Sequence, residues 1–126
     1  MITKGFKATN SDMTCLSFQF ELNKEFTIEG GIKICEKGFH FCKDLKDVFE
    51  YYPFNSRFFE IETEGTVETD GKKSVTNKIR FVKEITDFVH NSEELQKFVV
   101  KKNGMAIQYI KNPSEEVQKI TAANQK

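Results

Sequence analysis

The chain has 126 residues, 38% of them hydrophobic and 30% charged, and its 19 basic residues balance its 19 acidic ones. This length suits one compact domain, and a net charge of zero lacks the positive field of nucleic-acid-binding proteins, so we expect no direct nucleic-acid binding. No segment approaches the roughly 18 apolar residues that span a membrane, and the N-terminus lacks the apolar core of a secretory signal. For this reason we expect no membrane binding. Three cysteines do not form a disulfide framework, so we expect a cytoplasmic, reduced protein.

Much of the first two-thirds of the chain alternates between apolar and polar residues, as strands do. The clearest case is CLSFQFEL, residues 15–22, which predicts one half-buried strand. Its apolar face consists of Leu16, Phe18, Phe20 and Leu22. Residues 2–8 and 25–29 are weaker strand candidates.

The stretch ICEKGFHFC, residues 34–42, combines thiols, an imidazole and phenyl rings. Gly38 suits a left-handed position, so Glu36-Lys37-Gly38 predicts a bulged hairpin loop between two short strands. In that register Cys35 points away from His40 and Cys42, and a zinc site needs four converging ligands. We therefore expect no metal and no cofactor here. His40 would point away from Phe39 and Phe41, which makes it a candidate binding residue.

A short helix is predicted over residues 44–52. Asp44 is a good N-cap, and Pro53 disfavours helix at the residue before it. The apolar stripe of this helix is Leu45, Val48, Phe49 and Tyr52.

Strands resume at Arg57. Arg57 shares its parity with the apolar residues that follow, so it lies at the rim of that face, where arginines beside tyrosines can hold carboxylates or phosphates. Together with His40, we expect Tyr51, Tyr52 and Arg57 to form a binding site. The opposite face is acidic and is a candidate protein-interaction surface; it contains Glu60, Glu62 and Glu64. Residues 74–85 are expected to form one long strand after a turn at Asp70-Gly71.

The period becomes helical after Asn91, which is the expected N-cap of a helix ending at Gly104. SEELQK at residues 92–97 returns as SEEVQK at residues 114–119, a spacing of 22 residues. We interpret this as one helical repeat and the start of a second, which would dock on the strand-rich body or on a partner because such units need neighbours.

The patterns KGF, CEKGFHFC and DVFEYYP resemble a domain of unknown function found in phage, prophage and gut-bacterial proteins. The matching block runs from Cys35 through Gly38 and His40 to Cys42, and the resemblance covers about residues 2–86. The chain departs from the pattern at Ser17 and Asn23, where the family tends to have glycine. The resemblance implies a mobile-element protein and brings no catalytic activity with it.

Two further resemblances bear on architecture. The tail KNGMAIQYIKNPSEEVQ resembles helical repeats of similar phage and bacterial proteins, which implies a binding scaffold. The order of strand GFHF, helix and strand resembles the middle of ADP-ribosyltransferase domains. This would place His40, Tyr51 and Arg57 beside a nicotinamide-type pocket, although no catalytic glutamate can be assigned.

These observations predict an α+β fold, with a bent antiparallel sheet crossed by one short helix. Residues 1–88 would form the strand-rich domain and residues 89–126 a helical repeat extension packed on it. The function that we expect is non-enzymatic binding of a host protein in a bacterial cell, for example as an anti-CRISPR inhibitor of a defence system. The alternative is an ADP-ribosyltransferase-like enzyme or nucleotide-binding protein. The partner's identity and the oligomeric state stay open.

Overall fold

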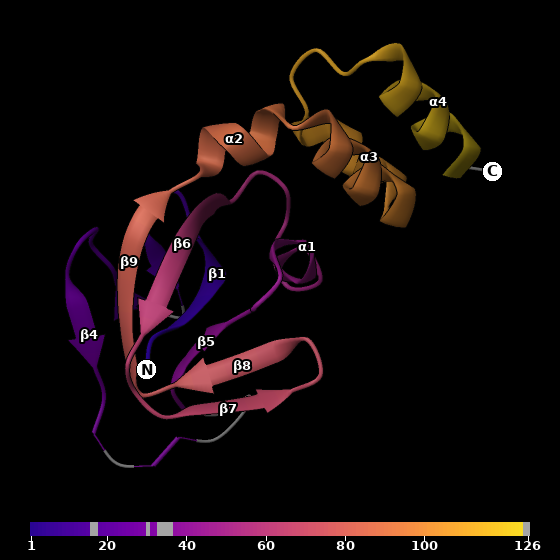
Figure 1. Cartoon of the computed structure of the whole chain (residues 1–126). Helices are drawn as coiled ribbons and strands as arrows, with labels where there is room; N and C mark the ends of the chain where they lie inside the picture. The colour runs from indigo at the N-terminus through magenta and orange to yellow at the C-terminus, as the bar shows by residue number, and fades with distance from the viewer. Residues whose placement is uncertain (16–17, 30, 33–36, 125–126) are drawn as a thin grey trace. The chain divides into compact units, whose positions relative to one another are not determined.

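The computed structural model describes residues 1–15, 18–29, 31–32 and 37–124, and confirms an α+β fold with antiparallel sheets and short helices (Figure 1). The strands are β1 (Thr3–Thr9), β2 (Thr14–Cys15), β3 (Phe18–Gln19), β4 (Glu25–Thr27), β5 (Phe39–Phe41), β6 (Arg57–Thr63), β7 (Val67–Asp70), β8 (Lys73–Thr76) and β9 (Lys78–Glu84). The helices are α1 (Leu45–Val48), α2 (Thr86–Asn91), α3 (Glu93–Lys102), the 3-10 helix η1 (Gly104–Tyr109) and α4 (Glu115–Asn124). Among the described residues, no helix combines the length and apolar composition needed to cross a membrane.

The chain divides into two compact units. Unit 1 contains residues Met1–Tyr52 and Ser56–Ile85, and unit 2 contains Pro53–Asn55 and Thr86–Lys126. All the strands belong to unit 1, whereas α2, α3, η1 and α4 belong to unit 2. Each unit is described below by itself.

The main sheet of unit 1 has the strand order β1-β6-β9-β4, and its strands curve strongly (Figure 1). Along β1 and β6 the register runs from Thr3 opposite Thr63 to Thr9 opposite Arg57. Along β6 the alternation follows the prediction, because Phe59, Ile61 and Thr63 are buried while the glutamates between them are not. The core around this sheet consists of Cys15, Phe20, Phe39, Phe41, Phe59, Ile61, Ile79 and Phe81.

The stretch at residues 15–22 does not form the single strand that its alternation predicts. β2 and β3 pair with each other in antiparallel fashion, with Cys15 opposite Phe18. Phe18, expected in the core, is 36% exposed, although its ring packs edge-on against those of Phe26 and Phe39. The apolar alternation here serves two short paired strands rather than one long one.

β5 pairs with β8 in antiparallel fashion. Phe39 lies opposite Thr76 and His40 opposite Val75, while residues 33–36, the other half of the expected hairpin, lie outside the described residues. Gly38 has φ +127, as its predicted left-handed position requires, and a Cβ there would lie 2.4 Å from Val75 Cγ2. The glycine therefore permits the close approach of β5 and β8.

The long strand predicted over residues 74–85 is two strands in two sheets. β8 continues the sheet β5-β8-β7, whereas β9 joins the main sheet, and Asn77 separates them. The Asn77 side-chain oxygen accepts a hydrogen bond from Thr66 N at 3.0 Å, and its backbone oxygen accepts one from Ile28 N at 2.9 Å. Asn77 thus bonds to the segment before β7 through its side chain and to the end of β4 through its backbone, at the point where the chain passes from one sheet to the other.

The helix after β5 begins as predicted and ends sooner. Asp44 is its N-cap and accepts a hydrogen bond from Lys46 N, but the regular helix ends at Val48. Turns then carry the chain to Tyr52, whose amide donates to Val48 O at 3.1 Å.

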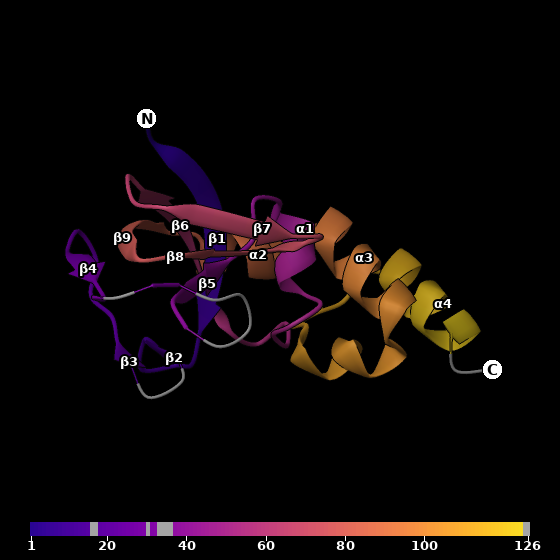
Figure 2. The ribbon, with the colours of Figure 1, turned by 90° about the horizontal axis from the view of Figure 1, so that it is seen from below.

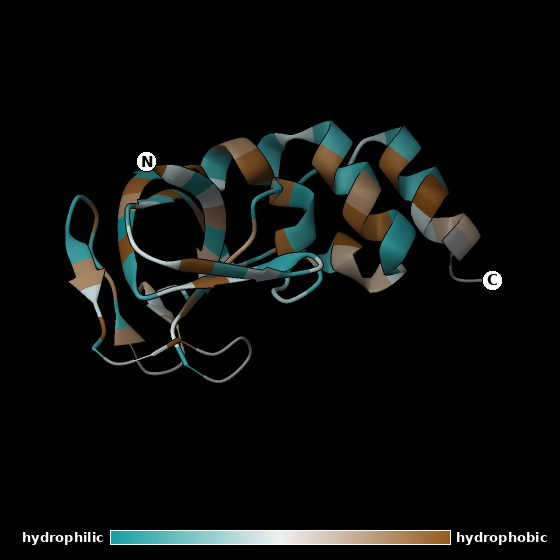
Figure 3. Cartoon of the chain, turned by 60° about the horizontal axis from the view of Figure 1, so that its bottom comes forward, coloured by the Kyte–Doolittle hydropathy of each residue, from teal (hydrophilic) through white to brown (hydrophobic). Residues whose placement is uncertain are grey.

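Unit 2 is built from capped helices. The N-cap of α3 is Ser92, not Asn91, which is the last residue of α2; the Ser92 hydroxyl accepts from Leu95 N. Figure 2 shows α3 and α4 side by side, and in Figure 3 apolar and polar residues alternate along both helices, as expected for helices packed on one face.

The two SEE-x-QK copies contact each other in this pair. The hydroxyl of Ser114 caps α4 by accepting from Val117 N and donates to Glu93 Oε1 at 2.6 Å. Lys97 of the first copy forms an ion pair with Glu116 of the second. The two copies thus bond to each other through non-equivalent residues, as neighbouring units can in stacked helical arrays.

Candidate functional site

A cavity of about 590 Å³ lies within unit 1. Its walls come from β1, β2, β3, β5, the turns after α1 and β8. The described lining residues are Phe6, Lys7, Ala8, Cys15, Phe18, Phe20, Ile28, Lys37, Gly38, Phe39, His40, Phe41, Cys42, Val48, Tyr51, Tyr52 and Lys73. Most of this surface is aromatic or aliphatic, with a few polar groups among the rings, which is the composition of small-molecule sites.

The most unusual lining residue is Lys7, a lysine of β1 that is only 4% exposed. Its ammonium donates to the backbone oxygen of His40 at 2.6 Å and lies 5.9 Å from the centre of the Phe20 ring. Burial lowers the pKa of Lys7, and hydrogen bonding and proximity to Cys15 partly oppose that shift. A buried charge is costly unless it is compensated, so this position is not explained by packing alone.

Cys15 and Tyr52 form a second polar contact on the wall. The Cys15 thiol and the Tyr52 hydroxyl lie 2.7 Å apart. Burial and this contact raise the pKa of Tyr52 well above its ordinary value, so the phenol stays protonated at neutral pH.

Cys42 and His40 are also neutral at pH 7. Burial, with the charge of Asp47, raises the pKa of Cys42 to about 11. Burial, followed by the positive charges of Lys7 and Lys73, lowers the pKa of His40 below its ordinary 6.5. The imidazole is therefore uncharged near physiological pH and can donate or accept a hydrogen bond.

Two lysines contribute charge nearer to solvent. Lys73 of β8 lies with its ammonium 4.8 Å from the centre of the Tyr51 ring, and Lys37 precedes Gly38 on the cavity wall. No aspartate or glutamate lines the cavity in the described part of the chain.

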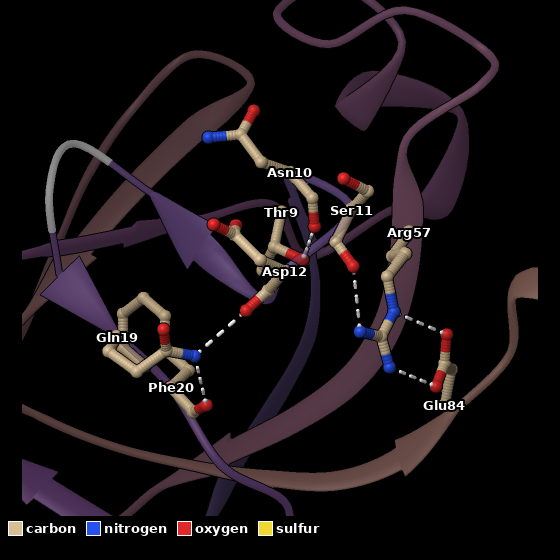
Figure 4. Close-up of polar contacts among 8 residues, drawn as sticks. All are labelled: Thr9, Asn10, Ser11, Asp12, Gln19, Phe20, Arg57 and Glu84. Atoms are coloured by element: carbon tan, nitrogen blue, oxygen red, sulfur yellow. Dashed lines mark hydrogen bonds and ion pairs between the residues drawn. The ribbon is translucent and has the colours of Figure 1, made fainter.

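Three of the four predicted binding residues line this cavity, namely His40, Tyr51 and Tyr52. Arg57 does not. Its guanidinium holds Glu84 through two hydrogen bonds of 2.9 and 2.7 Å and donates to Ser11 O at 3.1 Å, as Figure 4 shows. The rim position expected for Arg57 on the face of Phe59 is present, because the guanidinium lies 5.4 Å from the centre of that ring. Its polar capacity is used to join β6 to β9.

The acidic residues of β6 face basic neighbours across the sheet. Glu60 lies opposite Lys83, and Glu62 lies opposite Lys4 on β1 and Arg80 on β9. Residues directly opposite on antiparallel strands share a face, so the field there has mixed sign. Glu64 lies after the end of β6 and is exposed.

Sequence reasoning missed Lys7, Cys15 and Lys73 as site residues. The sequence signal for Lys7 was its position in the strand: it lies on the same face of β1 as Gly5 and Thr9, both of which are also buried. A lysine in that series signals either an exposed face or a functional buried charge, and the sequence alone favoured neither. Cys15 meets Tyr52 from 37 positions away, and no local pattern reports that contact.

The cavity lies within the part of the chain that matches a known protein family. Residues 3–90, well over half of the chain, match a family described as a domain of unknown function, DUF7666. The chain belongs to this family. All described lining residues of the cavity fall inside the DUF7666 match, whereas the SEE-x-QK repeats lie beyond it. No curated protein matches the chain, and no solved structure matches it either.

Proposed function

We propose that the chain is a small-molecule-binding protein and that its ligand occupies the cavity of unit 1. The observation that carries this proposal is the cavity itself, about 590 Å³ with aromatic walls and converging polar groups. Binding sites for small organic molecules typically range from about 300 to 1,000 Å³ and share this composition.

The walls suit a planar apolar body of one or two rings. Phe18, Phe20 and Phe39 have ring centres between 4.9 and 5.8 Å apart, which is the spacing of interacting aromatic pairs. The polar side chains of Cys15, His40 and Tyr52 also line the cavity. Binding here is non-covalent and needs no catalytic step.

The test uses naphthol, a neutral two-ring probe. We expect saturable binding in ligand-observed NMR, with amide shift changes confined to β1, β5 and the α1 turn. Bound naphthol should also slow alkylation of Cys15, measured for its own peptide by mass spectrometry. A disaccharide of similar volume is the control and should leave the Cys15 rate unchanged. Absence of saturable naphthol binding, or shifts spread over unit 2, would contradict the proposal.

The transferase alternative has less support. His40, Tyr51 and Tyr52 gather at the cavity, but Arg57 is occupied by Glu84, and the described lining offers no glutamate. Binding of a host protein, including an anti-CRISPR role in a phage or prophage setting, stays a prediction. Its most specific support is the apolar side chains that unit 2 exposes on α2 and η1, namely Phe88, Met105 and Tyr109. Co-purification with a bacterial protein that is lost in the Met105→Asp variant would support it, and retention in that variant would count against this surface.

A further inference from the structure

The described charged residues that line the cavity all have the same sign. Lys7, Lys37, Lys73 and the neutral His40 line it, and the described lining contains no carboxylate. The phenol of Tyr52 and the thiol of Cys42 keep their protons at pH 7, because burial raises the pKa of each. Neither of these two groups provides a negative charge inside the cavity.

The ammonium of Lys7 has bonding capacity left for a ligand. An ammonium has three N–H donors. Within the described residues, the backbone oxygen of His40 accepts a hydrogen bond from this ammonium at 2.6 Å. Lys7 lines the cavity, and burial there makes a further, charge-assisted hydrogen bond from its ammonium stronger than it would be in water.

The three lysines differ in exposure, and this difference assigns their roles. Lys7 is buried, Lys73 is half-buried and Lys37 is exposed. Charges in contact with solvent are screened by salt within about 10 Å, whereas a buried charge is screened much less. Lys37 and Lys73 therefore attract an anion to the cavity, while Lys7 can hold it once water has been displaced.

We infer that the natural ligand is an organic acid, an anionic carboxylate or phosphate group on an aromatic body, whose acid group bonds to the Lys7 ammonium. This inference rests on the proposed function, since it names the chemical class of that ligand. The rings of Phe18, Phe20 and Phe39 receive the aromatic body, and the acid group completes the donors of Lys7 and compensates its buried charge. The protein thus selects its ligand by charge at a buried position, where salt screens the interaction much less than it does in water.

The experiment compares four probes with one shared body: naphthoate, naphthyl phosphate, neutral naphthamide and the naphthylmethyl ammonium ion. Dissociation constants are measured by calorimetry or NMR on the wild-type chain. A hydrogen bond to a charged group predicts that the better acid binds about tenfold or more tightly than the amide, and that the ammonium ion binds most weakly. Whichever acid binds better identifies carboxylate or phosphate as the natural group.

Lys7→Met and Lys4→Met are the matched variants. Both remove one positive charge from β1, but Lys4 is exposed whereas Lys7 is buried. Lys7→Met replaces a buried ammonium by an apolar side chain of similar length, and an amide NMR spectrum of each variant checks that the fold persists. We expect Lys7→Met to lose the preference for acid over amide, and Lys4→Met to keep both the wild-type preference and the wild-type affinity for naphthol. The preference should also survive about 0.5 M NaCl if Lys7 supplies it.

Each of the other outcomes contradicts either the inference, the role of Lys7 or the proposed function. Equal binding of acid and amide by the wild-type chain overturns the inference and leaves the proposed function standing. An acid preference that persists in Lys7→Met, or that disappears in high salt, overturns the role of Lys7. Failure of all four probes and of naphthol overturns the proposed function itself.

Discussion

In unit 2, the buried polar side chains bond to nearby backbone: Gln96 donates to His90 O and Thr121 donates to Val117 O. In unit 1, Lys7 donates to His40 O and Cys15 contacts Tyr52, and both contacts join residues far apart in the sequence beside a cavity. The local bonds of unit 2 satisfy the helices with little else required. The contacts of unit 1 hold a charge and a space that stability alone does not need, and this difference locates the functional part of the chain.

The largest effect that tests this contrast should come from Gly5→Ala. An added Cβ would lie 2.5 Å from Phe41 Cδ2 and 2.8 Å from Cys42 O, so β1 and β5 would have to separate. We expect a loss of about 3 kcal/mol in the free energy of unfolding, measured in urea, together with loss of naphthol binding.

Gly31→Ala is the matched control for Gly5→Ala, because a Cβ at Gly31 meets no atom within 4 Å. Its free energy of unfolding should change by less than about 0.5 kcal/mol. If Gly5→Ala is as mild as Gly31→Ala, the close approach of β1 to β5 does not shape the cavity.

The second effect concerns the Cys42 thiol. Its pKa of about 11, against 9.0 for an ordinary thiol, leaves about 100-fold less thiolate at pH 8 in the folded chain than in the unfolded one. We expect iodoacetamide to modify Cys42 at least 100-fold more slowly in buffer than in urea, as measured by mass spectrometry of its peptide.

The sign of the pH dependence follows from the same shift. Between about pH 9 and 11 the folded chain retains a proton on Cys42 that the unfolded chain has lost, so this group makes the free energy of unfolding fall as the pH rises through that window. Equal alkylation rates in buffer and urea would show that Cys42 is not enclosed by the cavity wall.

The smallest effect should come from Ser114→Ala in unit 2, compared with Ser92→Ala at the same position of the other repeat. Both lose a helix N-cap, worth about 1 kcal/mol, but Ser114 also donates to Glu93. We expect Ser114→Ala to destabilise unit 2 by about 0.5 kcal/mol more in thermal unfolding, with naphthol affinity unchanged in both variants. A change in naphthol affinity would contradict the proposal that unit 1 binds the ligand without help from unit 2.

The sequence predicted features that depend on near neighbours. Alternation identified the buried face of β6, the N-cap propensity of Asp44 located the start of α1, and the backbone freedom of Gly38 identified its left-handed position. Features that depend on distant partners were missed. Val75 and Ile79 share a parity, yet the bonds of Asn77 to Thr66 and Ile28 place them in different sheets.

The candidate site divides in the same way. His40, Tyr51 and Tyr52 could be proposed because they cluster around one strand and one helix. Lys7 could not, since a lysine is ordinarily exposed and only the packing of β1 against β5 and β6 buries it. The sequence predicted that Arg57 lies on the face of Phe59, but it did not predict the ion pair with Glu84, which is 27 residues away.

The β1–β6 register has a consequence for how the protein folds. Thr3 pairs with Thr63, so β1 can pair only with a strand about 60 residues further along the chain. This pairing gives unit 1 many contacts of long sequence separation. β6, β7, β8 and β9 follow one another along the chain and can associate earlier, at a smaller cost in loop-closure entropy. On a ribosome, β1 would emerge first and dock late. Lys7 would then stay hydrated through most of folding and lose its water only when the sheet closes.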